Sequence, residues 1–224
     1  MTNKHSENVL VTGFGPFNNV PINASWEAVA LLPNEINNCN IIKEQIPVAY
    51  KHVQENIPIL WEKYKPKLVI HVGVSSIAED IVLETCANRV GYQRKDIDDC
   101  CPDGGEACCG KSNPLDCITT MLCTKTISEY VFQRTNLNVS ISNDPGRYLC
   151  EFIYYNSLSQ DRKRTLFVHV PPLNQPFSKS ELVQALQEII KCALELLESE
   201  EKSKYSIYPP GTTKIYKNGR AAAF

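Results

Sequence analysis

The chain has 224 residues and a formal net charge of -2, with 43% hydrophobic and 21% charged residues. These values are typical of a globular protein and give no electrostatic reason to expect nucleic acid or an anionic membrane as a partner. The polar residues 1–8 lack the apolar run of a signal peptide, and no stretch reaches the roughly 18 apolar residues that span a bilayer. We therefore expect a cytosolic protein whose ten cysteines are mostly reduced thiols.

The first third of the chain alternates apolar runs with amphipathic segments. Short apolar runs predict buried strands at residues 8–13, 40–46 and 67–73. Helical spacing predicts a helix at 24–32, with Asn23 as its N-cap, and a second helix at 50–64 that stops before Pro66.

The remaining elements follow a long irregular segment. Residues 91–114 are rich in Gly, Pro, Asp and Cys without periodicity and predict a loop. The later patterns predict a helix at 116–132, a strand at 137–142, a helix that begins at Asp144-Pro145, a strand at 165–170 and an amphipathic helix at 180–199.

Strands that alternate with helices indicate an α/β fold in which a largely parallel sheet is covered on both faces. No internal repeat and no linker divides the chain, so residues 1–200 are predicted to form one domain. Residues 201–224 are polar and contain Pro and Gly, and we expect a flexible C-terminal tail there.

Two side chains are candidates for thiol chemistry. Cys150 lies early in a predicted helix, where the N-terminal amides and the helix dipole favour an anion. His169 lies near the end of a predicted strand, the usual place for reactive groups in open α/β sheets. His71 has a very similar setting, and most cysteines and strand histidines are structural, so these patterns alone do not choose a catalytic pair.

Four motifs resemble the pyroglutamyl-peptidase I family of cysteine peptidases, and particularly its animal members. They are Val11-Thr-Gly-Phe-Gly-Pro-Phe17 with Asn23-Ala-Ser-Trp26, His71-Val-Gly-Val74 through Leu83-Glu84, Ser142-Asn-Asp-Pro-Gly-Arg-Tyr-Leu-Cys150 with Tyr154-Tyr155-Asn-Ser-Leu158, and Phe167-Val-His-Val-Pro-Pro-Leu173. The resemblance runs in order from about residue 9 to residue 198 and implies a single three-layer α/β/α domain with a largely parallel twisted sheet.

The resemblance implies a peptidase that removes an N-terminal pyroglutamyl residue from peptides. It assigns Cys150 as the nucleophile, His169 as the general base and Glu84 as the carboxylate that orients the imidazole, a role that the chemistry requires. Phe14 and Phe17 match the aromatic residues that hold the pyroglutamyl ring, and stacking faces suit a small uncharged lactam. The reaction requires no metal or cofactor, and the sequence leaves the oligomeric state open.

Two positions depart from the family's pattern, and one cluster stands outside it. Pro145 replaces the usual small residue, and the asparagine of the animal relatives is shifted to Asn88. Several cysteines gather between Cys100 and Cys123, but adjacent pairs suit zinc poorly, so incidental or oxidation-sensitive thiols are the preferred interpretation.

Three other functions compete with this hypothesis. They are a catalytically silent binder of pyroglutamyl peptides, a thiol amidase acting on another blocked N-terminus, and an interaction protein organised around a zinc loop. A nucleotide-binding loop is disfavoured because Gly13-Phe-Gly15 lacks a third glycine and runs into Pro16.

Overall fold

The computed structural model describes residues 7–17, 20–107 and 114–207, with side chains described as far as residue 202. Part of the predicted loop at 91–114 and most of the predicted tail lie outside these ranges. No helix in the described part of the chain is long and apolar enough to cross a membrane.

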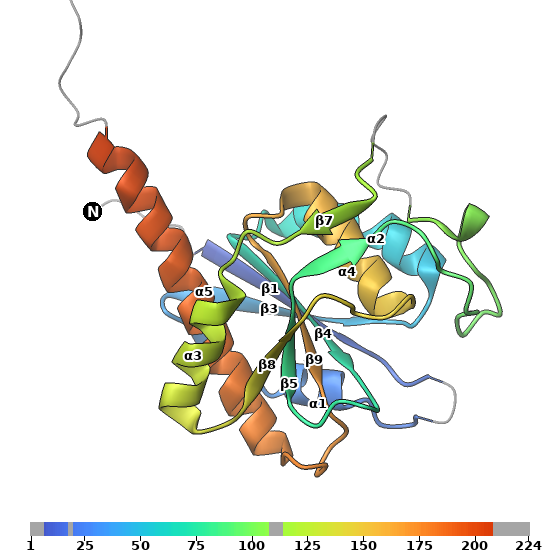
Figure 1. Cartoon of the computed structure of the whole chain (residues 1–224), viewed down its shortest axis with the longest axis horizontal. Helices are drawn as coiled ribbons and strands as arrows, with labels where there is room; N and C mark the ends of the chain where they lie inside the picture. The colour runs from blue at the N-terminus through green and yellow to red at the C-terminus, as the bar shows by residue number, and fades with distance from the viewer. Residues whose placement is uncertain (1–6, 18–19, 108–113, 208–224) are drawn as a thin grey trace, which may run out of the picture.

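A mixed seven-stranded sheet forms the centre of the molecule (Figure 1), with the order β2-β3-β1-β4-β9-β5-β8. Its four parallel central strands are β1 (Glu7–Phe14), β3 (Cys39–Ile46), β4 (Leu68–Val74) and β9 (Thr165–Val170). The strands β2 (Glu35–Ile36) and β5 (Ile81–Glu84) pair antiparallel to β3 and β9, and β8 (Val139–Ser142) runs parallel to β5. A separate two-stranded sheet joins β6 (Cys86–Asn88) and β7 (Cys117–Thr119).

In the part of the chain that the structure describes, five α-helices cover the two faces of the central sheet. The helices α1 (Ala24–Ala30), α3 (Thr124–Thr135) and α5 (Lys179–Ile207) pack together on one face. The helices α2 (Tyr50–Tyr64) and α4 (Leu149–Asp161) pack on the other face, and a 3-10 turn at Asp103–Gly105 follows β6. The prediction of an α/β/α domain with a mostly parallel sheet is thus confirmed.

The alternation of side chains along each strand explains the two cores. Val9 and Val11 of β1 face α1, α3 and α5, whereas Leu10 faces α2 and α4. On β9, Val168 likewise joins the first core, and Phe167 joins the second. His169 is therefore directed to the face that α4 covers, because it lies two residues after Phe167.

The predicted strands of the central sheet and the second helix match the structure closely. The helix α2 has the predicted limits, 50–64, and buries Tyr50, Val53, Ile57 and Trp61. It ends because Lys65 adopts a left-handed conformation, one residue before Pro66. Asn23 caps α1 as predicted, because its side chain accepts a hydrogen bond from the Ser25 amide.

Two predicted helices are wrong in part. Residues 117–119 of the predicted helix 116–132 form β7, which pairs with β6, and the helix begins only at Thr124. Asp144 does not cap a helix, because Gly146 has a φ of 77° and Tyr148 is extended, so α4 begins at Leu149. Cys150 is consequently the second residue of the helix.

The C-terminal helix is longer than its pattern predicted. The helix α5 continues to Ile207, so the first part of the predicted tail, 201–207, is helical. Charged residues with good helix propensity, such as Glu200, Glu201 and Lys202, extend it beyond its last apolar contacts. The rest of the predicted tail, 208–224, lies outside the described residues.

Candidate active site

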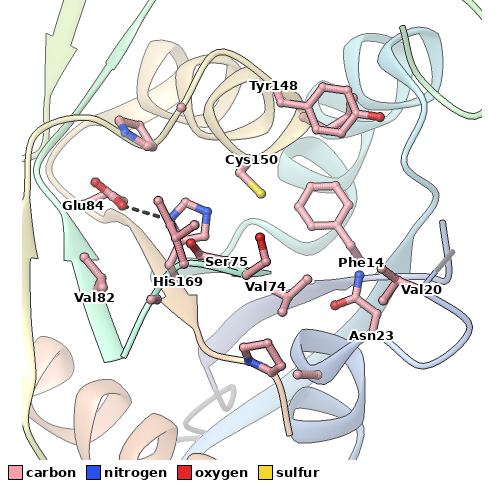
Figure 2. A pocket seen from close by; sticks show the side chains of 18 of the residues that line it. Phe14, Val20, Asn23, Val74, Ser75, Val82, Glu84, Tyr148, Cys150 and His169 are labelled. Carbon is pink, nitrogen blue, oxygen red and sulfur yellow. Dashed lines mark hydrogen bonds and ion pairs between the residues drawn. The ribbon is translucent and has the colours of Figure 1, made fainter. Parts of the chain in front are cut away.

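The fold places the Cys150 thiol at the N-terminus of α4, above the central sheet. Amides in the first turn of a helix have no intrahelical acceptor and direct their partial positive charge toward groups at that end. Most of α4 is buried between the sheet and α2, which fixes the position of the thiol. In Figure 2 the thiol points into the space between His169 and the ring of Phe14.

Gly73 of β4 provides the space that the thiol occupies. A Cβ atom built at this position would lie 2.7 Å from Sγ of Cys150 and 2.8 Å from Cζ of Phe167. Gly73 is also the register partner of His169 on the neighbouring strand β9. The glycine therefore allows the sulfur to descend to the level of the imidazole.

His169 and Glu84 form a buried pair beside this thiol. Nδ1 of His169 donates a hydrogen bond to Oε1 of Glu84 at 2.8 Å, and the two side chains are 8% and 3% exposed. Because this bond engages Nδ1, Nε2 is the ring nitrogen that remains to interact with the Cys150 thiol. Oε2 of Glu84 is buried and accepts no hydrogen bond from the described residues. A carboxylate with so few partners favours a positive charge on the adjacent imidazole.

The pKa of His169 reflects its surroundings. Burial alone would lower it, but the interactions with the Cys150 sulfur and the Glu84 carboxylate outweigh burial and raise the pKa to about 9. The imidazole is therefore protonated at neutral pH. A protonated imidazole next to a thiol at a helix N-terminus is the environment in which cysteines act as nucleophiles.

His71, the other candidate histidine, lies elsewhere on the same face of the sheet. Its register partner is Phe167, two residues before His169, so it meets α4 two turns after Cys150, at Ser157. Nε2 lies 2.7 Å from Oγ of Ser157, and Nδ1 lies 2.7 Å from Oγ1 of Thr12. Full burial lowers the pKa of His71 to about 3. It is a neutral core group, away from the thiol.

A pocket of about 1320 Å³ opens beside Cys150 and His169. Phe14 and Phe17, the predicted ring-binding residues, both line it, the first fully buried and the second half-buried. Figure 2 shows the ring of Phe14 facing Cys150 across the pocket, with Tyr148 beside it. The wall opposite the thiol is thus aromatic, and charged side chains such as Glu84, Arg94 and Arg147 also line the pocket.

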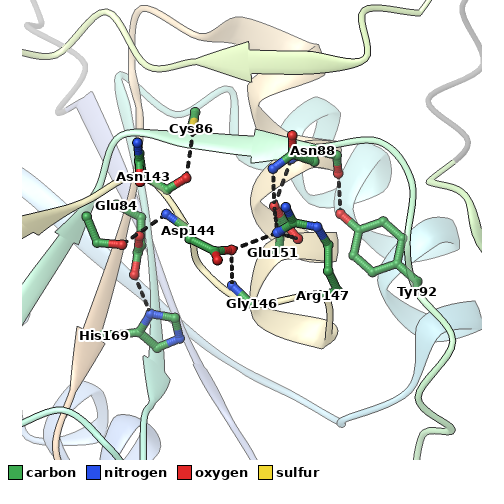
Figure 3. A network of polar contacts seen from close by, with 11 residues as sticks. Glu84, Cys86, Asn88, Tyr92, Asn143, Asp144, Gly146, Arg147, Glu151 and His169 are labelled. Atoms are coloured by element: carbon green, nitrogen blue, oxygen red, sulfur yellow. Dashed lines mark hydrogen bonds and ion pairs between the residues drawn. The ribbon is translucent and has the colours of Figure 1, made fainter.

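A polar network behind the thiol was not anticipated from the sequence (Figure 3). Glu151, which follows Cys150, is 0% exposed and accepts two hydrogen bonds from Arg147 Nη1. The backbone amide and Nδ2 of Asn88 both donate to Oε1 of Glu151 at 2.9 Å. Asn88 therefore fixes the carboxylate next to the candidate nucleophile rather than lining the pocket. The acidic residue after Cys150 was the available signal, because buried acids need such partners.

The predicted helix-starting residue Pro145 lines the pocket from the loop before α4. This loop is held by Asp144, whose carboxylate accepts from Arg147 Nη1 at 2.8 Å. Because the loop is not helical, the missing amide hydrogen of Pro145 removes no donor from the first turn of α4.

The cysteine cluster gives no metal site in the described residues. No group of three or more His, Cys, Asp or Glu side chains there is arranged to hold a metal ion. Cys108 and Cys109, two members of the cluster, lie outside the described ranges.

A thiol, an imidazole and a carboxylate in this order, at a helix N-terminus beside a pocket, form the arrangement that thiol hydrolases use. The family model of pyroglutamyl peptidases matches residues 7–191, more than half of the chain. The chain belongs to the pyroglutamyl peptidase family.

Individual relatives agree with this assignment. Pyroglutamyl-peptidase 1 of Homo sapiens is 44% identical over 201 residues, which cover 86% of this chain and 92% of the human protein. The pyrrolidone-carboxylate peptidase of Thermococcus onnurineus is 32% identical, covering 82% and 93%. The solved structure of a mutant pyrrolidone carboxyl peptidase from Pyrococcus furiosus superposes with a TM-score of 0.75 at 25% identity, covering 85% of this chain and 99% of the other.

Proposed function

We propose that this chain is an exo-acting cysteine peptidase that hydrolyses the N-terminal pyroglutamyl residue of peptides, with Cys150 as nucleophile, His169 as its proton-transfer partner and Glu84 as the residue that orients His169. Membership of the pyroglutamyl peptidase family supports the activity. One observation supports the roles: three side chains from separate elements, α4, β9 and β5, meet at one pocket.

The proposed reaction uses these three groups in sequence. The Cys150 thiolate attacks the carbonyl carbon that links the pyroglutamyl ring to the next residue, and amides of the first turn of α4 stabilise the oxyanion. Imidazolium His169 protonates the departing amine, which becomes the new N-terminus of the peptide. The neutral imidazole then takes a proton from water, which attacks the acyl-enzyme and releases pyroglutamate. The hydrogen bond to Glu84 holds the tautomer throughout.

The pocket supports selectivity for a blocked N-terminus. The aromatic faces of Phe14 and Phe17 suit a small, flat, uncharged lactam. A peptide with a free N-terminus would place an ammonium against the same faces, and burying an unpaired charge costs several kcal/mol. Unblocked peptides would therefore be rejected by orders of magnitude.

We also propose the cytosol as the site of this activity. The described cysteines, including Cys150, are free thiols. A thiolate nucleophile depends on a reducing compartment of this kind to remain active.

Hydrolysis of a fluorogenic pyroglutamyl amide tests the proposal. We expect turnover by the wild-type protein, dependence on a reducing agent, and a loss of roughly 10⁴-fold or more in kcat for Cys150→Ala. The matched control is Cys123→Ala, which removes an exposed thiol from the start of α3 and should retain wild-type turnover. Equal activity of Cys150→Ala and wild type would remove Cys150 from the mechanism. Binding of a pyroglutamyl peptide without turnover would instead identify a silent member of the family.

A further inference from the structure

A second pair of thiols lies on the small β6–β7 sheet, outside the pocket. In its antiparallel register Cys86 faces Thr119, and Asn88 faces Cys117. Cys86 and Cys117 therefore lie on the same side of the sheet as diagonal neighbours. Their side chains are in hydrogen-bonding contact, and both are free thiols, Cys86 half-buried and Cys117 exposed.

The two thiols differ in their accessibility. Burial, together with the neighbouring Cys117, raises the pKa of Cys86 to about 11, so Cys86 remains protonated at neutral pH. Cys117 is exposed and is the thiol that a reagent from solution meets first. This combination, an accessible attacking thiol with a second thiol in contact, is typical of reversible disulfide formation.

We propose that Cys86 and Cys117 form a reversible disulfide by exchange with low-molecular-weight disulfides such as oxidised glutathione. The Cys117 thiolate attacks one sulfur of the reagent, forms a mixed disulfide and releases one reduced thiol. The sulfur of Cys86, losing its proton to solvent, then attacks the Cys117 sulfur and releases the second reduced thiol. The protein loses two hydrogen atoms, and the reagent is reduced to two thiols.

The disulfide would change contacts close to the catalytic groups. Cys86 lies two residues after Glu84, and its thiol donates to the carbonyl oxygen of Asn143 at 3.2 Å (Figure 3). Asn143 belongs to the loop between β8 and α4 that leads to Cys150. Oxidation would remove this donor and would link β6 covalently to β7. The inference concerns other residues than the proposed active site and does not depend on the proposed function.

The test uses the full chain with Cys150→Ala, so that the candidate nucleophile does not react. This protein, and versions that also carry Cys117→Ser or the control Cys123→Ser, are incubated with oxidised glutathione and digested without reduction. We expect a linked peptide pair that contains Cys86 and Cys117, present with the control substitution, absent with Cys117→Ser, and reversed by dithiothreitol. The disulfide closes a loop of about 30 residues, so the oxidised protein should melt about 7–15 °C higher.

Three results would overturn the inference. One is linkage of Cys117 to any other cysteine, including Cys108 and Cys109, which the peptide map covers. Another is a stable mixed disulfide of glutathione on Cys117 that Cys86 does not resolve. The third is an unmodified Cys86–Cys117 pair under conditions that oxidise the exposed Cys123.

Discussion

A methyl group at Gly73 would occupy the space that the Cys150 sulfur now fills. The added Cβ would lie 2.7 Å from Sγ of Cys150 and 2.8 Å from Cζ of Phe167. Favourable contacts between such atoms lie at about 3.5–4.0 Å, so the sulfur or the ring must move by about 1 Å. The Phe167 ring is fully buried against α4, which leaves the thiol as the group that yields.

We therefore predict that Gly73→Ala lowers kcat/KM for the fluorogenic amide by about 100-fold, since a displacement of about 1 Å from the reactive geometry costs about that factor. This corresponds to a loss of about 2.7 kcal/mol of transition-state stabilisation. Overpacking should also destabilise the fold by about 1–3 kcal/mol, measured by urea unfolding.

The control for this substitution is Gly15→Ala. A Cβ there would lie 3.7 Å from the Gln45 side chain, which is an ordinary contact, so activity should stay within about threefold of wild type. The reasoning is refuted if Gly73→Ala is folded and as active as Gly15→Ala. The thiol would then not need the position above Gly73.

Three further predictions follow from the buried polar groups. Glu84→Gln should lower kcat by about 10³-fold. It should also move the alkaline limb of the pH–rate profile below about pH 9, because the carboxylate no longer raises the pKa of His169. An unchanged alkaline limb would show that Glu84 does not raise this pKa. Burial lowers the pKa of His71 from 6.5 to about 3. Between these two pH values the unfolded chain binds more protons than the folded chain. The free energy of unfolding therefore falls as the pH decreases, by up to about 1.4 kcal/mol per pH unit. In urea unfolding, the stability of His71→Asn should decline less steeply with decreasing pH than that of the wild type. An equal pH dependence would assign the acid sensitivity to other groups. Arg147→Ala should lower the free energy of unfolding by about 2–3 kcal/mol, because the buried Glu151 loses its ion pair. The loss is moderate because the Arg147 side chain is itself partly exposed. Adding Glu151→Gln should recover part of that loss, and no recovery would mean that the charge is not the cause.

Much of the fold could be predicted from local patterns. The apolar runs of β1, β4 and β9 have a length and composition that only buried strands satisfy. The limits of α2 follow from an uninterrupted apolar stripe ended by Pro66. These elements were predictable because their signals are local and agree with their tertiary surroundings.

The missed elements depend on partners distant in sequence. The short strands β6 and β7 carry little apolar periodicity, and they become strands by pairing with each other. Apolar residues before α3, such as Ile118 and Leu122, have the spacing of a helical face, and the helix was therefore predicted to begin too early. At 144–148, local capping signals predicted a helix start, but Gly146 adopts a left-handed conformation that delays it.

In the candidate site, too, local patterns predicted some features, while others depend on residues distant in sequence. A position early in a predicted helix made Cys150 a candidate, and a position near a strand end made His169 one, but only the register of β4 against β9 separates His169 from His71. The family resemblance nominated Glu84, and no local pattern placed it beside His169. Glu84 reaches the imidazole because β5 runs antiparallel to β9. The sequence patterns predicted a largely parallel sheet, and this antiparallel strand was not anticipated.

The two histidines that face α4 constrain how this helix can vary. Cys150 and Ser157 stand two turns apart on one side of α4, and the histidines stand two strand positions apart beneath them. Inserting or deleting a single residue between Cys150 and Ser157 would rotate the helix by about 100° and would turn one of these side chains away from the sheet. Length variation in homologous chains is therefore tolerable in the loops on either side of α4, but not within those two turns.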